Sequence, residues 1–191
     1  MIIYEVYPST FQFEGIESAL DLISNDQNDL YSLIMVLKMN NIKVYNTFIY
    51  SLIKEIINYN KKYLEPINKN NDKYISGGYV QKKISYYQAH RLKTKKIELN
   101  KELFSDFLDI ISMINNKNIK LILVYAPSPT SNYNRYINNS YFDSVMNSYS
   151  VFYNFNNILP LKDSFFYDYD HLNQIGVEAF NEKLIERIKK M

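Results

Sequence analysis

The chain has 191 residues and a mass of 22.8 kDa, enough for one domain with a real core and too short for two of ordinary size. Its composition is globular, and a formal charge of +2 gives no global field that would point to DNA or a membrane. There is no cysteine, which excludes disulfides, thiolate metal sites and a cysteine nucleophile. No basic leader and no apolar run of about 18 residues is visible, so neither a targeting segment nor a membrane span is expected.

The first sixty residues predict one strand followed by helices. Residues 2–7 are β-branched and aromatic and stop at Pro8-Ser9-Thr10, as expected of a buried strand that runs into a loop. From 14 to about 60 the apolar residues recur at helical spacing, with breaks near 24–27 and 40–43. This pattern predicts three short helices.

The middle of the chain is expected to be irregular and then basic. Residues 58–78 are rich in Asn and Lys, with Pro66 and Gly77-Gly78 marking bends. Residues 79–97 carry six Lys or Arg and no acid. A solvated surface is one interpretation of this basic segment, and binding of an anionic polymer through its lysines and tyrosines is the other.

The second half of the chain alternates helices and strands. Asn100 can cap a helix that ends near 116, and residues 119–125 form an apolar strand. A further helix is expected over about 141–149 and a third strand over 151–156. A helix followed closely by a buried strand is half of a βαβ unit, so parallel strands are expected.

The chain ends with a loop over 157–172 and a helix over about 174–190. Three strands separated by helices predict an α/β fold with a mainly parallel sheet. We expect one domain over 1–191, with a helical and basic insertion at about 14–98. Sites in such sheets lie beyond the carboxyl ends of the strands, so chemistry is expected in the loops that follow them.

The loop before the last helix holds the residues best suited to catalysis. His171 is one of two histidines, and Asp168 precedes it by three residues. In a tight turn the carboxylate can accept from one imidazole nitrogen, which fixes the tautomer and leaves the other nitrogen as general base. A helix-capping aspartate beside a half-buried histidine is the structural alternative. A divalent metal site built from Asp163, Asp168, Asp170 and His171 is less favoured because regular ligand spacing is absent, and no metal or cofactor is expected.

Asp168-x-x-His171, followed by Leu172-Asn173-x-x-Gly176-x-x-x-Phe180, resembles the C-terminal block of the SGNH/GDSL hydrolases. In that family the block supplies the Asp and His of a Ser–His–Asp triad. The resemblance is nearest to the envelope-associated AlgJ/DltD-like branch, whose members are linked to acyl-group chemistry on cell-surface polymers. It covers roughly residues 100–191 and implies a three-layer, flavodoxin-like sheet.

Other family blocks have no counterpart in this sequence. The Gly-Asp-Ser nucleophile motif and the glycine oxyanion donor are missing, and the first strand is similar to the family's third. Pro8-Ser9-Thr10 stands where the family's Asn donor would follow. The resemblance therefore implies the C-terminal portion of such a protein, with a sheet that is incomplete on its N-terminal side. An unpaired strand edge of this kind would favour self-association.

Three further residues are candidate site residues because of where they stand relative to the predicted strands and the last helix. Ser9 directly follows the first strand and is a candidate nucleophile, with an ordinary turn serine as the alternative. Ser128 follows a strand between two prolines, and together with Asn173 it is a candidate for the wall of a substrate groove. His90 has no acid nearby and is expected to be exposed.

The resemblance implies part of an ester hydrolase or acyltransferase that acts on O-acyl groups of a carbohydrate or cell-envelope polymer. We expect it to be inactive alone, because the serine nucleophile is absent. Its expected partners are a small ester or acylated carbohydrate and a second copy of the chain, but not nucleic acid. A cell-envelope location follows only if an upstream anchor exists. The alternative is a non-catalytic binding or scaffolding domain that uses residues 79–97.

Overall fold

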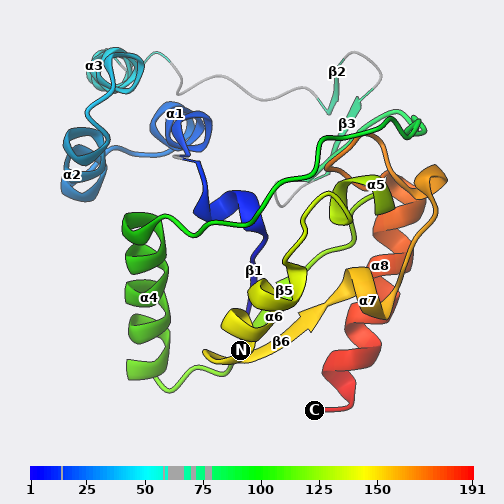
Figure 1. Cartoon of the computed structure of the whole chain (residues 1–191). Helices are drawn as coiled ribbons and strands as arrows, with labels where there is room; N and C mark the ends of the chain where they lie inside the picture. The colour runs from blue at the N-terminus through cyan, green and yellow to red at the C-terminus, as the bar shows by residue number, and fades with distance from the viewer. Residues whose placement is uncertain (14, 58, 60–66, 70–71, 76–78) are drawn as a thin grey trace. The chain divides into compact units, whose positions relative to one another are not determined.

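A computed structural model of the chain describes residues 1–13, 15–57, 59, 67–69, 72–75 and 79–191 (Figure 1). The chain divides into two compact units, one made of Met1–Gln12 with Ile67–Met191 and the other of Phe13–Pro66. The insertion expected at about 14–98 is therefore not one segment. Its helical part belongs to the second unit, whereas its basic part belongs to the first.

The first unit contains two small sheets and their covering helices. Its elements in chain order are β1 (Ile2–Glu5), η1 (Pro8–Phe11), β2 (Asn68–Lys69), β3 (Asp72–Ile75), β4 (Tyr79–Gln81), α4 (Lys101–Asn116), β5 (Leu121–Tyr125), α5 (Thr130–Tyr133), α6 (Asn139–Asn147), β6 (Val151–Asn154), α7 (Phe155–Ile158), η2 (Asp163–Phe165) and α8 (Gln174–Lys189). The helices and strands expected after residue 100 are all present, close to their predicted bounds.

The main sheet has the order β1-β5-β6, and both pairings are parallel, which confirms the prediction. The central strand β5 is buried at all five positions. This unbroken apolar run is typical of a strand covered on both faces, which has no solvent side to alternate with. Among the described residues β1 pairs with β5 alone, so the other edge of β1 is open, as expected.

Helices cover both faces of this sheet (Figure 1). On one face Leu123 of β5 packs in a core with Phe107 of α4, to which α6 also contributes. On the other face Val124 packs with Phe155 of α7 and Phe180 of α8, whose rings meet edge to face at 5.0 Å. The mixed α/β class is thus as predicted.

A second, antiparallel sheet has the order β2-β3-β4. The expectation that residues 58–78 are irregular is therefore wrong for β2 and β3. These strands are short and contain polar residues such as Asp72 and Lys73, so no alternation of apolar residues reveals them. Pro66 and Gly77-Gly78, which were expected to mark bends, lie outside the described residues.

Residues 82–99, called the strap below, run extended from β4 to α4 across the carboxyl end of the main sheet (Figure 1). The strap is tied to the loops that follow all three strands of that sheet. Its Tyr87 N–H donates to the carbonyl of Phe166, and its Lys95 N–H donates to the carbonyl of Arg135. Lys95 Nζ also donates to Oε1 of Gln12 at 3.3 Å, and next to the strap the N–H of Asn100 donates to the carbonyl of Phe11.

The second unit is helical, as predicted, with α1 (Ile16–Asn25), α2 (Leu30–Met39) and α3 (Ile42–Ile56). Asp29 and Ser32 form a capping box at the start of α2, and Asn41 caps α3. The polar residues between the expected helices therefore end one helix and begin the next. Within the described ranges of the chain, no helix is long and apolar enough to cross a membrane.

Candidate active site

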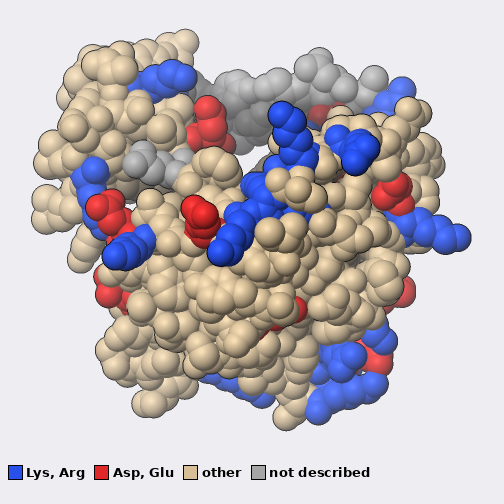
Figure 2. Space-filling model, viewed as in Figure 1, with Lys and Arg blue, Asp and Glu red and all other residues tan. Residues whose placement is uncertain are grey.

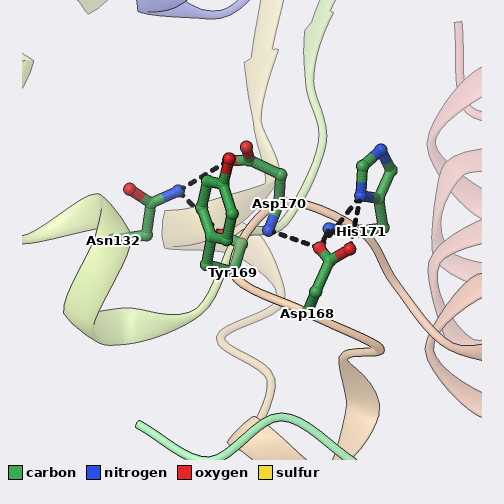
Figure 3. A network of polar contacts seen from close by, with 5 residues as sticks. All are labelled: Asn132, Asp168, Tyr169, Asp170 and His171. Carbon is green, nitrogen blue, oxygen red and sulfur yellow. Dashed lines mark hydrogen bonds and ion pairs between the residues drawn. The ribbon is translucent and has the colours of Figure 1, made fainter. Parts of the chain in front are cut away.

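His171 and Asp168 form the predicted pair in the loop before α8 (Figure 3). Nδ1 of His171 lies 2.9 Å from Oδ1 and 3.0 Å from Oδ2 of Asp168. The same Oδ1 accepts the backbone N–H groups of Asp170 and His171 at 2.9 and 2.8 Å. The carboxylate therefore organises the turn and orients the imidazole, which confirms the expected contact.

The electrostatics of Asp168 favour the charged form. Partial burial raises the pKa of Asp168, but the hydrogen bonds from the Asp170 N–H, the His171 ring and the His171 N–H together hold it below its ordinary value. An ionised Asp168 can only accept, so Nδ1–H of His171 donates the hydrogen bond and Nε2 is the ring nitrogen left to act as a base. The His171 side chain is 75% exposed, which leaves this nitrogen accessible to a reacting group.

A second network holds the neighbouring residues in place (Figure 3). Nδ2 of Asn132, from the buried side of α5, donates to the Tyr169 carbonyl at 2.9 Å and to Oδ1 of Asp170 at 3.0 Å. Asp170 is thus bonded to Asn132 rather than to the His171 ring, in keeping with a supporting role. Burial raises the pKa of Asp170, and the Asn132 hydrogen bond opposes the rise.

Asn173 is a structural cap rather than an available substrate contact. Its Oδ1 accepts the Gly176 N–H at the start of α8. Its Nδ2 lies within hydrogen-bond distance of three backbone carbonyl oxygens, which are those of Ser85 at 3.2 Å, Ser164 at 2.8 Å and Phe166 at 3.4 Å. Although Asn173 borders the site pocket, its amide is occupied in joining the strap, the loop and α8.

Gly176 allows α8 to begin close to the loop. A Cβ at this position would lie 2.1 Å from the Phe165 carbonyl oxygen and 2.9 Å from Cδ2 of Leu172. Only a residue without a side chain fits there unless the backbone moves. The Asn173 and Gly176 positions of the family-like block therefore have a local structural explanation.

A pocket of about 400 Å³ lies at the carboxyl end of the sheet, between β1 and α8. His171 and Asp170 line it together with Glu5, the last residue of β1. This places His171 on the predicted side of the sheet. Lys82 and Lys83 of the strap also line this pocket. Lys82 Nζ lies 5.1 Å from the centre of the Tyr167 ring.

Glu5 is a functional candidate that the sequence reasoning missed. Desolvation in the pocket raises the pKa of its carboxyl group, and the charge of His171 acts in the opposite direction. An acid at the end of an otherwise apolar strand was the available signal in the sequence. The other ionisable side chains that line this pocket include His171, Asp170, Lys82 and Lys83.

Neither of the two candidate serines lines this pocket. Ser9 is in η1, where its carbonyl accepts the Gln12 N–H, and it does not line the pocket. Ser128 donates through Oγ to Oδ1 of Asn156 at 2.9 Å and borders a separate pocket of about 170 Å³. Among the described residues that line the larger pocket there is no serine, threonine or cysteine.

The alternative of a metal site is not supported by the positions of the acidic residues. Within the described parts of the chain, no three His, Asp or Glu side chains are gathered closely enough to hold a metal ion. Asp163 belongs to η2, and the Asp170 carboxylate accepts a hydrogen bond from the Asn132 amide. The geometry thus favours an acid–base pair over a metal centre.

The basic segment is partly a structural element. Figure 2 shows Lys and Arg side chains along the course of the strap, and several have partners. Lys95 Nζ lies 4.7 Å from the centre of the Tyr136 ring and donates to Oε1 of Gln12 at 3.3 Å. His90 is exposed, as expected, with its ring 5.8 Å from that of Tyr87. The strap therefore shapes one wall of the pocket in addition to carrying charge.

Comparisons with protein-family models, with curated proteins and with solved structures found no match to this chain. The class of protein that the fold and site define is accordingly an α/β protein with a parallel sheet and an Asp–His pair at the carboxyl end of its strands. The functional interpretation rests on this geometry.

Proposed function

We propose that this chain supplies the general base of a serine ester hydrolase or acyltransferase of the SGNH type. The observation that carries the proposal is the Asp168–His171 hydrogen bond beside a pocket at the carboxyl end of parallel strands. The helices on both faces of the sheet suit the three-layer arrangement that this proposal includes. His171 is the base, and Asp168 is the residue that orients it.

In the proposed reaction, Nε2 of His171 accepts the proton of a serine hydroxyl while the serine oxygen attacks the carbonyl carbon of an ester. Asp168 stabilises the imidazolium through Nδ1–H. The imidazolium then protonates the departing alkoxide as the C–O bond breaks, and an acyl-enzyme forms. Water or an acceptor hydroxyl repeats the sequence and releases the acyl group.

We further propose that the serine comes from a segment outside the 191 residues. The support for this step is the serine-free lining of the pocket among the described residues. The open edge of β1 is where an additional strand could pair, and Glu5 at the end of β1 borders the pocket directly. A serine after such a strand would lie at the same end of the sheet as His171.

A carbohydrate O-acyl ester is the proposed substrate, by resemblance. The pocket volume of about 400 Å³ is within the range of small-molecule sites. Lys82 and Lys83 at its wall would favour a substrate that carries negative charge near the ester. This assignment gives the basic segment a part in the same site, so a separate binding function is not needed to explain it.

Fluorophosphonate labelling of the 191-residue chain tests where the nucleophile lies. We expect no covalent labelling and no serine-dependent hydrolysis of an aryl acetate by the chain alone. Adding an upstream segment with a Gly-Asp-Ser motif should give labelling that is lost with His171→Ala. Strong labelling of the chain alone that disappears with Ser9→Ala would show that the nucleophile is internal and contradict this part of the proposal.

A further inference from the structure

A second, smaller pocket lies at the carboxyl ends of β5 and β6. Its volume is about 170 Å³, and its polar lining consists of hydroxyl and amide side chains, namely those of Ser128, Thr130, Tyr133, Asn134, Asn156 and Asn157. Among the described residues that line it there is no charged side chain. Pro127 lines both this small pocket and the pocket of His171, so the two adjoin at that residue.

The part of the lining that comes from α5 offers two polar groups to a ligand. Thr130 and Asn134 are one helical turn apart, and the Asn134 N–H donates to the Thr130 carbonyl at 3.0 Å. Both residues are exposed, and neither side chain has a hydrogen-bond partner within the described part of the chain. The Thr130 hydroxyl and the Asn134 amide can therefore each donate and accept.

Another part of the lining is held in place by the protein itself. Oδ1 of Asn156 accepts the N–H and the hydroxyl of Ser128 at 2.8 and 2.9 Å. Nδ2 of Asn156 donates to the Ala126 carbonyl at 3.2 Å and to Oδ1 of Asn154 at 3.1 Å. These contacts join the segment after β5 to the segment after β6, and a lining that is already fixed lowers the ordering cost of binding.

Tyr133 adds an apolar surface with a polar tip. Its hydroxyl accepts from Nδ2 of Asn154 at 3.0 Å and donates to Oδ1 of Asn157 at 3.4 Å. Its ring packs edge to face on Tyr125, with the ring centres 5.9 Å apart. The apolar part of the lining is completed by Pro127, Leu159, Pro160 and Leu161. The small pocket thus combines carbon surface with uncharged hydrogen-bonding groups.

This combination selects among the kinds of ligand. A divalent metal ion favours carboxylates and an anion favours cations, and the described lining contains neither. An apolar ligand would leave the amide of Asn134 without a partner. An uncharged ring that carries hydroxyl groups suits both surfaces, because its C–H face can cover Tyr133 while its hydroxyls exchange hydrogen bonds with Thr130 and Asn134.

We propose that the small pocket binds one uncharged sugar ring. Small-molecule sites usually measure about 300–1,000 Å³, so a pocket of about 170 Å³ suits a single ring better than an oligosaccharide. The inference deepens the proposed function and rests on it for the role of the ring, which would be the part of the substrate next to the ester. The same short helix serves both sites, because Asn132 of α5 holds Asp170 beside His171 (Figure 3).

A nuclear magnetic resonance titration of the isotope-labelled full chain tests the proposal. The probes are glucose, galactose and N-acetylglucosamine, each added alone. At least one should shift the amide signals of Ser128, Asn134 and Asn157 in a saturable way, with a dissociation constant in the millimolar range that suits a small ligand held by a few hydrogen bonds. Inorganic phosphate should leave these signals in place.

Two variants remove the available polar groups. Asn134→Ala should weaken sugar binding about tenfold, and Thr130→Val should weaken it about threefold. Thermal melting should show both variants folded, since both side chains are exposed. Asn116→Ala is the matched control, because Asn116 is also exposed but lines neither pocket, and it should bind the sugar as the wild-type chain does.

Three results would overturn the proposal. The absence of saturable shifts with all three sugars would show that the small pocket is only a hydrated recess. Larger shifts with phosphate than with any sugar would show an anion site. Sugar binding that Asn134→Ala leaves unchanged, or that Asn116→Ala weakens equally, would place the binding elsewhere on the chain.

The titration and the ester chemistry can fail separately. His171→Ala should bind the sugar as the wild-type chain does, since His171 does not line the small pocket. Sugar binding without any hydrolysis that depends on His171 would keep the small pocket as a sugar site and contradict the proposed function. Hydrolysis that depends on His171, without sugar binding, would keep the proposed function and contradict this inference alone.

Discussion

Nδ1 of His171 lies 2.9 Å from Oδ1 of Asp168, and that oxygen also accepts the backbone N–H of His171. One turn of chain thus builds both the imidazole contact and the backbone that supports it. The pair does not depend on residues from distant elements, which explains how a three-residue spacing in the sequence could predict it.

The pH dependence of Asp168→Asn is the first prediction. Because the folded state lowers the pKa of Asp168, its carboxylate contributes stability above its unfolded pKa of about 3.9, and this contribution is lost as the pH falls through the lower folded value. The variant should melt below the wild type at pH 7 and together with it at pH 2. The difference should be less than about 1 kcal/mol, because Asp168 is 37% exposed. A difference in melting temperature between the variant and the wild type that persists at pH 2 would show that the effect comes from packing and not from the charge.

Gly176→Ala should destabilise the first unit strongly. The added Cβ would lie 2.1 Å from the Phe165 carbonyl oxygen, so the loop or the start of α8 must shift. Urea denaturation should show a loss of about 2–3 kcal/mol. Gly15→Ala is the matched control, because its Cβ would lie 3.8 Å from the nearest heavy atom, and it should change stability little. Equal losses in both variants would contradict the steric explanation.

Asn173→Ala should lower the free energy of unfolding by more than the loss of an ordinary helix cap does. It removes the cap of α8 and leaves carbonyls of the strap and the loop without their amide donor. The expected loss is about 2–4 kcal/mol in urea denaturation. Asn100→Ala removes an exposed cap of α4 and should cost about 1 kcal/mol. If the two losses are equal, Asn173 acts as a cap only.

Glu5→Gln should stabilise the protein at neutral pH. Desolvation raises the pKa of Glu5, so the folded state favours the protonated form, and stability is lost as the pH rises through the folded pKa. A neutral glutamine avoids this loss. The variant should melt slightly above the wild type at pH 7, by less than about 1 kcal/mol because Glu5 is still exposed to solvent, and the advantage should vanish at pH 3. A lower melting temperature at pH 7 would instead show a favourable contact of the carboxylate.

Strong periodic patterns predicted most of the fold. The apolar run of β5 and the cap at Asn100 place a strand and a helix correctly because each depends on local residues. The pairs β2–β3 and β3–β4 were missed because their residues are polar and their pairing is set by neighbours rather than by alternation. The division into two units was also missed, since helical spacing says nothing about which helices share a core.

The site was predicted only where its chemistry is local. Asp168 and His171 lie within one turn, whereas Glu5, Lys82 and Asn132 reach the site through the sheet, the strap and α5. Long-range contacts of this kind leave no spacing in a single sequence. Ser128 follows a strand as expected, yet it faces the neighbouring pocket because Asn156 holds both its N–H and its hydroxyl.

The pH–rate profile of ester hydrolysis in His171 variants tests the central claim most directly. With an aryl acetate, the chain alone should show weak, water-based hydrolysis that rises with pH as one group loses a proton. His171→Ala should remove this rate, and Asp168→Asn should lower it by about 10²-fold or more, while circular dichroism shows both variants folded. An unchanged rate and profile in folded His171→Ala would contradict the assignment of His171 as a general base.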